Sequence, residues 1–538
     1  MVKRPAPDSA SGAARTKRPR RQYDQFYALS DEILLRILSN LSVQQLNLCQ
    51  RVSHRFKRVA GDSQLWKRAY YDRFVQPRLS RLSSRRTSDD EASSSKLTVW
   101  HRGDEMTKKS NVMHWKKQYK TRHNWAIGVC GVSEIPMSGR QQSPAIMARL
   151  HEGIVYTVDA VSGLRAWTYK NDRALLATYD LACEGRHAVP TSIATACETN
   201  LQLQRIAIGF DDGSFSIFIY DRESKMFIKS CQRAASSGSA ITALALSNSH
   251  LLCMNELQVL SLFRFDEVPG GTAQNLSLLV SLASQTAWPP LSLSIRPRGD
   301  SVLASIAYCM PTYTAGWSVG VQELLFSGFG DVLESRLACA AGQGFTSLSR
   351  DPRSIFRDQD THVNAVATRP HSSLKPTSLS YSHPYLLVSH ADNTMTLYMV
   401  RSTLSSLEIS PGKTLWGHTS SIFNAQVGGR GKAVSVSARG DEIRIWELEG
   451  GLRRRNSSGE DLRDASIQVT PEKRQPCSTE LDSLNTAKSK RDDLGLTLGI
   501  EADSIAITRG WVGFDDEAVI LLREQRPGLQ ALTIYDFS

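Results

Sequence analysis

The chain has 538 residues, of which 41% are hydrophobic and 22% charged, with a formal net charge of +12 at pH 7. This length suits two folded parts with connecting segments, while no stretch approaches the roughly 18 apolar residues of a membrane helix and the polar N-terminus lacks a secretory signal's apolar core. Nine cysteines without a CxxC pair provide no disulfide or zinc framework, so we expect reduced thiols in an intracellular protein.

Most of the positive charge lies in two segments. Residues 1–21 have a net charge of +6 and residues 78–122 one of +7, which leaves about −1 for the rest of the chain. A near-neutral folded part argues against a broad nucleic-acid-binding face.

The N-terminal residues 1–22 are rich in Pro, Ala, Ser and basic side chains, and we expect them to be disordered. They contain two basic clusters separated by twelve residues, which resemble a bipartite nuclear import signal: Lys3, Arg4, Lys17, Arg18, Arg20 and Arg21. The alternative interpretation is a solvated basic tail.

Four short helices are predicted in a domain spanning residues 23–76. Ser30 can cap the first helix, and Ser42 and Gln45 have the spacing of a capping box. Ser53 and Asp62 can cap the third and fourth. Apolar residues recur on one face of each helix, which predicts a small helical core.

A Ser- and Arg-rich stretch over residues 77–112 predicts a flexible linker. A helical connector is expected over residues 113–125.

From residue 126 to the end, short apolar strands alternate with Gly, Asp, Asn and Ser turns, a pattern typical of an all-β repeat. We place about seven units and expect a disordered insertion at 451–495. Residues 126–133 and 532–537 are expected to pair and close the repeat into a ring.

The segment 29–66 resembles the F-box family at these positions: Leu29, Glu32, Ile33, Leu34, Ile37, Leu38, Leu41, Leu46, Val52, Leu65 and Trp66. Ser30 replaces the family's proline and starts a helix equally well. The resemblance implies binding to a Skp-type adaptor, and through it to cullin, by Leu29, Ile33, Leu34, Ile37, Leu38, Leu41, Leu46, Val52, Leu65 and Trp66. The alternative is an ordinary helical subdomain that packs on its own β domain.

The β units resemble WD repeats. Gly417 and His418 match the family's opening Gly-His and Trp446 its closing Trp, with Glu447 where Asp is usual. Asp441 stands five rather than six residues before Trp446, which argues against the family's buried His–Ser–Asp–Trp network in this blade.

Two other turns fit better, since Asp212 and Asp392 stand six residues before Phe218 and Tyr398. The resemblance implies a β-propeller. The alternative is another all-β repeat architecture or a sandwich.

Catalytic and metal motifs are missing from the sequence. Gly428–Lys432 has the look of a phosphate loop, but Gln426 and Ala433 occupy positions that require Gly and Ser or Thr. The histidines form no HExxH, no GxSxG motif is present, and His418 is interpreted as structural. We therefore expect neither a cofactor nor a metal.

The order of the two parts resembles the F-box/WD-repeat receptors, and predicts an α+β multidomain protein with a helical F-box followed by a propeller. The implied function is the substrate-recognition subunit of an SCF-type E3 ubiquitin ligase, itself non-catalytic, that binds target proteins through its propeller. The expected location is the nucleus, with the cytoplasm as a second one. Two alternatives are a nuclear scaffold that holds the adaptor without ubiquitin transfer and a basic nucleic-acid-binding propeller.

In WD-repeat propellers targets commonly bind over one face, which here would include His418, Arg439, Asp392 and Asp212. A receptor for phosphorylated targets needs several arginines at one point. The candidates are Arg165, Arg296, Arg298 and Arg439, but the near-neutral charge favours mixed polar and apolar recognition. Ser457 follows an arginine run and is a candidate phosphorylation site.

Overall fold

The computed structural model describes residues 29–76, 114–137, 146–170, 173–181, 188–196, 202–234, 238–266, 275–283, 288–311, 316–340, 375–403, 406–428, 431–448, 466–471, 511–526 and 529–538. The chain divides into two compact units, residues 1–119 and residues 120–538. We refer to them as the helical unit and the propeller unit.

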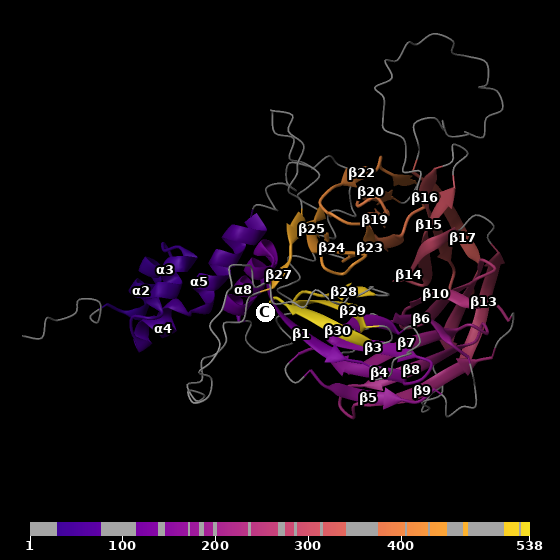
Figure 1. Ribbon diagram of the computed structural model, residues 1–538, viewed down its shortest axis with the longest axis horizontal. Coiled ribbons are helices and arrows are strands. Elements are labelled where there is room, and N and C mark those ends of the chain that lie inside the picture. The colour runs from indigo at the N-terminus through magenta and orange to yellow at the C-terminus, as the bar shows by residue number, and fades with distance from the viewer. Residues whose placement is uncertain are drawn as a thin grey trace, which may run out of the picture. The chain divides into compact units, whose positions relative to one another are not determined.

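Short helices build the helical unit (Figure 1). They are α2 (Asp31–Leu38), α3 (Val43–Cys49), α4 (His54–Ala60), α5 (Ser63–Tyr70) and the π-helix η1 (Tyr71–Val75), followed by the start of α8 (Trp115–Ile127). Their core consists of Leu34, Leu38, Leu46, Val59, Ala60, Leu65, Trp66 and Tyr119.

The four predicted helix starts are confirmed. Ser30 accepts the Ile33 amide at 3.4 Å, and Ser42 forms a reciprocal capping box with Gln45. The side chains of Ser53 and Asp62 accept backbone amides of the third and fourth helices. Each cap satisfies an amide that the helix itself leaves unpaired, which is why these short helices begin where they do.

Helix α8 occupies the predicted connector, with residues 115–119 in the helical unit and the rest in the propeller unit. Within the propeller unit, the Trp125 ring stacks on Phe537 at a centroid distance of 4.2 Å and its indole N–H donates to the carbonyl of Asp516. The Lys432 ammonium lies 4.3 Å from the centre of the same ring. The last turns of α8 are thereby fixed to the final strand.

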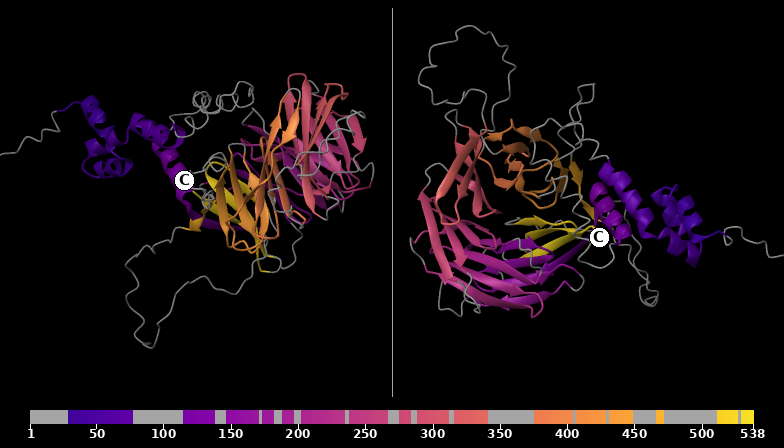
Figure 2. Two further views of the ribbon diagram at one scale, coloured as in Figure 1. Left: turned by 90° about the horizontal axis from the view of Figure 1, so that it is seen from above. Right: turned by 180° about the vertical axis from the view of Figure 1, so that it is seen from behind.

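Seven sheets arranged in a ring form the propeller unit in the described residues (Figures 1 and 2). The first three contain β2 (Met147–His151), β3 (Ile154–Asp159), β4 (Gly163–Thr168) and β5 (Leu175–Tyr179); β6 (Pro190–Thr195), β7 (Leu203–Phe210), β8 (Phe215–Asp221) and β9 (Met226–Arg233); and β10 (Ile241–Leu246), β11 (His250–Asn255), β12 (Val259–Asp266) and β13 (Asn275–Ala283).

The next three contain β14 (Trp288–Arg298), β15 (Ser301–Pro311), β16 (Trp317–Phe326) and β17 (Val332–Cys339); β18 (Ser378–Ser382), β19 (Tyr385–Ser389), β20 (Met395–Ser402), β21 (Leu407–Ile409) and β22 (Lys413–Leu415); and β23 (Ile422–Val427), β24 (Lys432–Ser437), β25 (Ile443–Glu447) and β26 (Ser466–Gln468). The seventh contains β28 (Val512–Phe514), β29 (Ala518–Arg526), β30 (Leu529–Asp536), β1 (Val129–Pro136) and β27 (Thr470–Pro471).

The predicted closure of the ring is confirmed. Strand β1 pairs antiparallel with β30, from Gly131 opposite Asp536 to Pro136 opposite Ala531. The first strands of successive sheets contact one another in the order β2, β6, β10, β14, β18, β23 and β28, and β28 returns to β2. Closure pairs a strand that would otherwise expose an edge.

The core lies between the sheets. A separate apolar cluster fills each junction between neighbouring sheets. Inner strands such as β3, β19 and β24 are buried along their whole length, and the polar side chains within them, such as Thr157 and Ser435, are buried as well. Each fully buried large side chain contributes about 1.5–3 kcal/mol of hydrophobic stabilisation.

One predicted boundary is wrong. Within the interval 451–495, expected to be disordered, β26 pairs with β25 and β27 pairs with β1. The reason is local apolar sequence, because Val469 is 8% exposed and packs into the cluster between the sixth and seventh sheets. The predicted tail 1–22 and linker 77–112 lie outside the described residues.

Candidate protein-interaction site

Ion pairs connect the first and third helices of the helical unit. Arg55 donates to Asp31 through Nε at 3.0 Å and Nη2 at 2.8 Å, and Arg58 lies 2.6 Å from the second carboxylate oxygen. Arg55 also donates to the carbonyl of Leu29. The hydrogen bond from Arg55, with the charge of Arg58, lowers the pKa of Asp31. These contacts fix the entry to α2.

Burial divides the predicted adaptor-binding residues into two groups. Leu34, Leu38, Leu46, Leu65 and Trp66 are 1–7% exposed and form the core of the helical unit. In the structure these side chains pack within their own unit and hold the helices together. Their contact with an adaptor stays a prediction.

The second group faces outward. Ile33 and Ile37 are 49% and 43% exposed, and Val52 is 70% exposed. Leu29 and Leu41 are partly buried against the core. Since residues four apart lie on one side of a helix, Ile33 and Ile37 form an exposed apolar pair on α2.

Sequence reasoning missed Leu48, which is 60% exposed on α3. Val52, which is also exposed, lies in the turn that follows this helix. The sequence did contain a signal for the exposure of Leu48. Leu48 stands two residues after the buried Leu46, and a helix of only seven residues cannot bury both sides.

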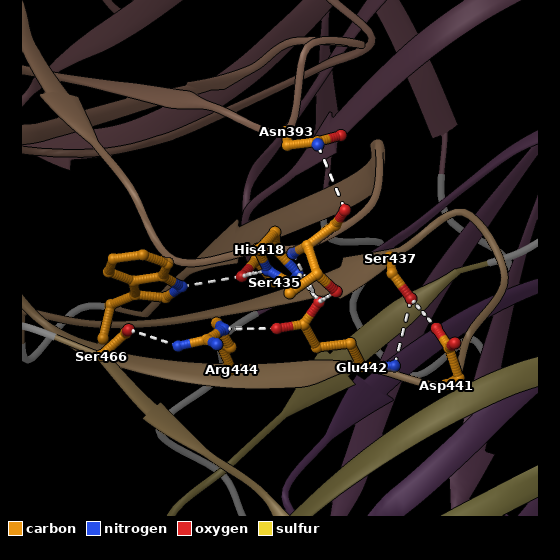
Figure 3. A network of polar contacts seen from close by, with 10 residues as sticks. Asn393, His418, Ser435, Ser437, Asp441, Glu442, Arg444 and Ser466 are labelled. Carbon is orange, nitrogen blue, oxygen red and sulfur yellow. Dashed lines mark hydrogen bonds and ion pairs between the residues drawn. The ribbon is translucent and has the colours of Figure 1, made fainter.

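A polar network lies inside the sixth sheet of the propeller unit (Figure 3). Trp446 Nε1 donates to Ser435 Oγ at 2.7 Å, and Ser435 Oγ lies 2.6 Å from His418 Nε2. Because the Ser435 oxygen accepts from the indole, its own proton is directed to His418 Nε2. The imidazole then carries its proton on Nδ1, which lies 3.4 Å from a carboxylate oxygen of Glu442.

The spacing argument against this network is therefore wrong, because Glu442 takes the position expected of an aspartate. Glu442 Oε2 accepts from the amide and the hydroxyl of Thr419 at 2.9 and 3.0 Å, and its Oε1 accepts from Arg444 Nε at 2.6 Å. Asp441 instead accepts from the Ser437 hydroxyl. Glu442 stands one residue nearer to Trp446 than Asp441 does. Its side chain is one methylene longer than that of aspartate, so its carboxylate extends to His418 and Thr419.

Burial and hydrogen bonds act in opposite directions on these groups. Burial lowers the pKa of His418, and the nearby Glu442 carboxylate opposes this. Burial acts to raise the pKa of Glu442, but the bonds from Thr419 and Arg444 outweigh it and the pKa is lowered. The arrangement is a neutral imidazole beside a carboxylate, consistent with the structural role predicted for His418.

In the sheets where the structure describes them, the turns between second and third strands lie at one end of the ring, which we name the BC end. Asp212 and Asp392 lie in such turns and each accepts an amide two residues later, as predicted. Arg439 lies in the corresponding turn of the sixth sheet. Asn393 donates to the carbonyl of Thr419, so the fifth turn contacts the loop that carries His418.

The four candidate arginines do not come together. Arg165 is buried, 2.7 Å from Asp159, and donates to the carbonyl of Met137. Arg296 and Arg298 lie near the end of β14, where the chain turns into β15 at the end of the ring opposite the BC end. Only Arg439 of these four belongs to an exposed turn at the BC end.

The BC end exposes apolar and acidic side chains instead. Val161, Leu257 and Trp416 are 56%, 64% and 60% exposed in its turns and loops. Carboxylates accompany them on several blades: Asp211, Asp212, Glu256, Asp392 and Asp441.

The glycine-rich stretch before Lys432 joins two strands, β23 and β24, and Lys432 itself is buried in β24. This is the strand-to-strand context expected of a propeller loop.

Among the described residues no group of three His, Cys, Asp or Glu side chains is placed to hold a metal ion. None of the described helices has both the length and the apolar character needed to cross a membrane. The predicted import residues Lys3, Arg4, Lys17, Arg18, Arg20 and Arg21 lie outside the described residues.

Comparisons with known proteins address both units. A family model described as the F-box protein pof12 beta-propeller matches residues 130–538, and one described as F-box-like matches residues 31–72. None of the curated proteins matches the chain.

Similar solved structures include the WD40 beta propeller domain of Doa1, with 12% identity over 76% of this chain and 97% of that chain and a TM-score of 0.33. YCF48 from Cyanidioschyzon merolae has 7% identity over 76% of this chain and 99% of that chain, with a TM-score of 0.40. The complex of KlAtg21 with the coiled-coil of AgAtg16 has 7% identity over 72% of this chain and 94% of that chain, with a TM-score of 0.37.

Proposed function

Since this chain belongs to the F-box protein pof12 beta-propeller family, we propose that it is the substrate-recognition subunit of an SCF-type E3 ubiquitin ligase. In this proposal the helical unit binds a Skp-type adaptor, and through it cullin, while the propeller unit binds target proteins. The observation that carries the proposal is an exposed isoleucine pair on the first helix of the F-box-like segment, in one chain with a closed propeller.

The adaptor would cover Ile33 and Ile37. Burying an apolar side chain that is about half exposed is favourable at roughly 25 cal/mol per Å² of area removed from water. An amphipathic helix that leaves an apolar pair uncovered is the form in which helices dock into grooves of partner helices. Leu48 on α3 and Val52 in the turn after that helix are also exposed apolar side chains and extend the proposed contact.

The propeller would supply the target-binding surface at its BC end. Exposed Trp416, Leu257 and Val161 offer apolar contact area, and tryptophan is among the residues that most often dominate binding energy. Carboxylates on neighbouring turns add polar contacts. A receptor of this kind needs no catalytic group, because holding a target near a charged enzyme raises the effective concentration of its lysines.

The test uses the tagged full chain and asks whether adaptor and cullin copurify. Changing Ile33 and Ile37 together to Asp should abolish adaptor binding, because two carboxylates would be desolvated at the contact. Changing Gln64 and Lys67 together to Asp is the matched control, since both side chains are exposed on α5. Leu34 is unsuitable, because it is 1% exposed and its replacement tests folding.

Undiminished adaptor binding by the isoleucine variant, with native helix content in both variants, would refute the proposed contact. Adaptor copurification without cullin would favour the second candidate, a nuclear scaffold that binds the adaptor without ubiquitin transfer. The basic clusters of residues 1–22 support nuclear import as part of either proposal. A reporter carrying these residues should enter nuclei and lose that ability when Arg18, Arg20 and Arg21 become Ala.

A further inference from the structure

Ser466 is the first residue of β26, the outermost strand of the sixth sheet. This strand has three residues and pairs with β25 from Ser466 opposite Trp446 to Gln468 opposite Arg444. The Ser466 hydroxyl accepts from Arg444 Nη1 at 3.0 Å. A partly exposed serine therefore stands at the end of a short edge strand with a guanidinium already beside its oxygen.

Arg444 connects Ser466 to the network of the sixth sheet (Figure 3). Its Nε donates to Glu442 at 2.6 Å, and the same carboxylate accepts the amide and hydroxyl of Thr419. One guanidinium thus holds Ser466 on one side and, through Glu442, the loop of residues 416–419 on the other. The Arg444 side chain is 16% exposed, so these bonds are poorly screened by water.

Gly417 leaves no spare volume at this point. A Cβ atom added to Gly417 would lie 3.0 Å from Ser466 Oγ, 3.1 Å from Arg444 Nη1 and 3.1 Å from the Trp446 ring. A group larger than a hydroxyl on Ser466 therefore has to move Gly417 or turn outward with Arg444. Moving Gly417 displaces its exposed chain neighbour Trp416, and turning Arg444 outward removes its bond to Glu442.

We propose that Ser466 is a phosphorylation site whose phosphate takes Arg444 from Glu442 and releases the loop of residues 416–419 at the BC end. In the transfer, Ser466 Oγ forms a bond to the γ-phosphorus of ATP while the bond from that phosphorus to the ADP oxygen breaks. The hydroxyl proton passes to a carboxylate of the protein kinase that supplies the reaction. In the sequence Arg463 stands three residues before Ser466, the spacing that basic-directed kinases favour.

The phosphate changes the local competition for the guanidinium. It brings close to two negative charges and three acceptor oxygens, and guanidinium–phosphate pairs form two parallel hydrogen bonds. Glu442 offers Arg444 one bond. The phosphate is the stronger partner, and Glu442 without Arg444 is a buried carboxylate that keeps the donors of Thr419 but has lost its balancing positive charge. Such a charge favours opening to water, and the bonds that hold Thr419 open with it.

Position in the strand makes Ser466 accessible to a kinase. Terminal residues of edge strands open at low free-energy cost, without unfolding the sheet. Ser435 and Ser437 of the interior strand β24 of the same sheet are fully buried and have no such route. Among these three serines only Ser466 combines an adjacent guanidinium with an accessible backbone.

The first experiment incubates the full chain with Mg·ATP and a basic-directed serine kinase and locates phosphate by tandem mass spectrometry. Ser457, which follows Arg454 at the same spacing, is the internal reference for kinase activity. Phosphate is expected on Ser466 of the native chain and is expected to disappear from that position in Ser466→Ala. A chain that takes phosphate at Ser457 and none at Ser466 overturns the site.

The second experiment tests the switch independently of any kinase, using a chain with genetically encoded phosphoserine at position 466. Hydrogen exchange of the Thr419 amide should accelerate roughly tenfold or more, the ratio that matches loss of a hydrogen bond to a charged group. Arg444→Gln should give fast exchange with or without phosphate, while the amides of the second sheet should be unchanged. Equal Thr419 exchange in the phosphorylated and unmodified chains would refute the switch.

Discussion

At the scale of single residues, the network of the sixth sheet shows what counting positions can and cannot predict. His418 and Trp446 were found by their spacing, and the structure joins them through Ser435. The acid was missed because the count required an aspartate at a fixed position. The network requires a carboxylate near His418 Nδ1, and Glu442, the residue after Asp441, provides it.

Glu442 should therefore matter more to stability than Asp441. Glu442→Gln removes the charge that accepts from Thr419 and Arg444, and we expect the free energy of unfolding to fall by about 1.5–3 kcal/mol. Asp441→Asn is the control, because that exposed side chain accepts one hydroxyl from Ser437 and its change should cost about 0.5–1.5 kcal/mol. Urea titrations measure both, and equal losses would argue against the assignment of Glu442.

The depressed pKa of His418 makes a prediction about acid stability. Above the ordinary histidine pKa of 6.5 the imidazole is neutral in both the folded and the unfolded state, so its stabilising contribution is complete. Below that value the unfolded chain binds a proton first, and stability is lost as the pH falls through the folded-state pKa. Between pH 7 and pH 5 the native chain should lose more unfolding free energy than His418→Gln.

One proton limits that difference to about 1.4 kcal/mol per pH unit. Burial also lowers the pKa of His151, His250 and His390, so the variant should retain part of the acid sensitivity. Parallel pH profiles for the two chains would show that His418 does not titrate as the buried environment requires.

At the scale of elements, capping chemistry located the helices but not their outward faces. Ile33, Leu34, Ile37 and Leu38 are all apolar, so the pattern alone gives a wide stripe with no marker for the side that packs inward. Tertiary packing decides it, with Leu34 and Leu38 inside and the isoleucines outside. The last strand of the sixth sheet was missed for the opposite reason, since β26 is too short for a visible period of two.

Strand β26 and the residue after it can be tested by a matched pair of substitutions. Val469 is packed into the cluster that includes Trp125 and Val434, while Gln468 is exposed. Val469→Asp should lower the unfolding free energy of the propeller unit by about 3 kcal/mol or more, because the charge is buried without a partner. Gln468→Asp should stay within about 0.5 kcal/mol of the native chain. Thermal or urea unfolding distinguishes the two variants. Similar unfolding free energies would show that residues 466–469 do not contribute to the packed sheet.

At the scale of the whole molecule, the closing pair of strands was predictable because both ends of the β region carry strand patterns and a ring needs a partner for each. The number of sheets was harder to predict, since the repeats are spaced unevenly: 38 residues (340–377) separate β17 from β18. The position of individual arginines around the ring was not predictable at all, because it depends on which end of its strand each residue occupies. Arg296 and Arg298 illustrate this: the sequence made them candidates for the binding face, but they lie near the end of β14 that is opposite the BC end.

That distribution of arginines leads to a prediction about the targets of the propeller. Recognition dominated by phosphate needs several guanidinium groups at one point, because bidentate pairs carry the affinity. Among the four candidates Arg165 is already paired with Asp159, and the two at the end of β14 face away from Arg439. The BC end offers apolar residues and carboxylates, for which phosphate on a target would be neutral or repulsive.

We therefore expect targets that copurify with the chain to bind it equally well, within about threefold, after phosphatase treatment of the target alone; threefold is less than 1 kcal/mol on the usual scale of tenfold per 1.4 kcal/mol. Treating the target separately keeps any phosphate on Ser466 of the receptor unchanged, so that the two effects are not confused. Trp416→Ala should weaken the same binding by about tenfold or more, since an exposed tryptophan at a contact often costs over 1 kcal/mol when removed. Complete loss of binding on dephosphorylation, with Trp416→Ala unaffected, would mean that arginines outside these four form the recognition site.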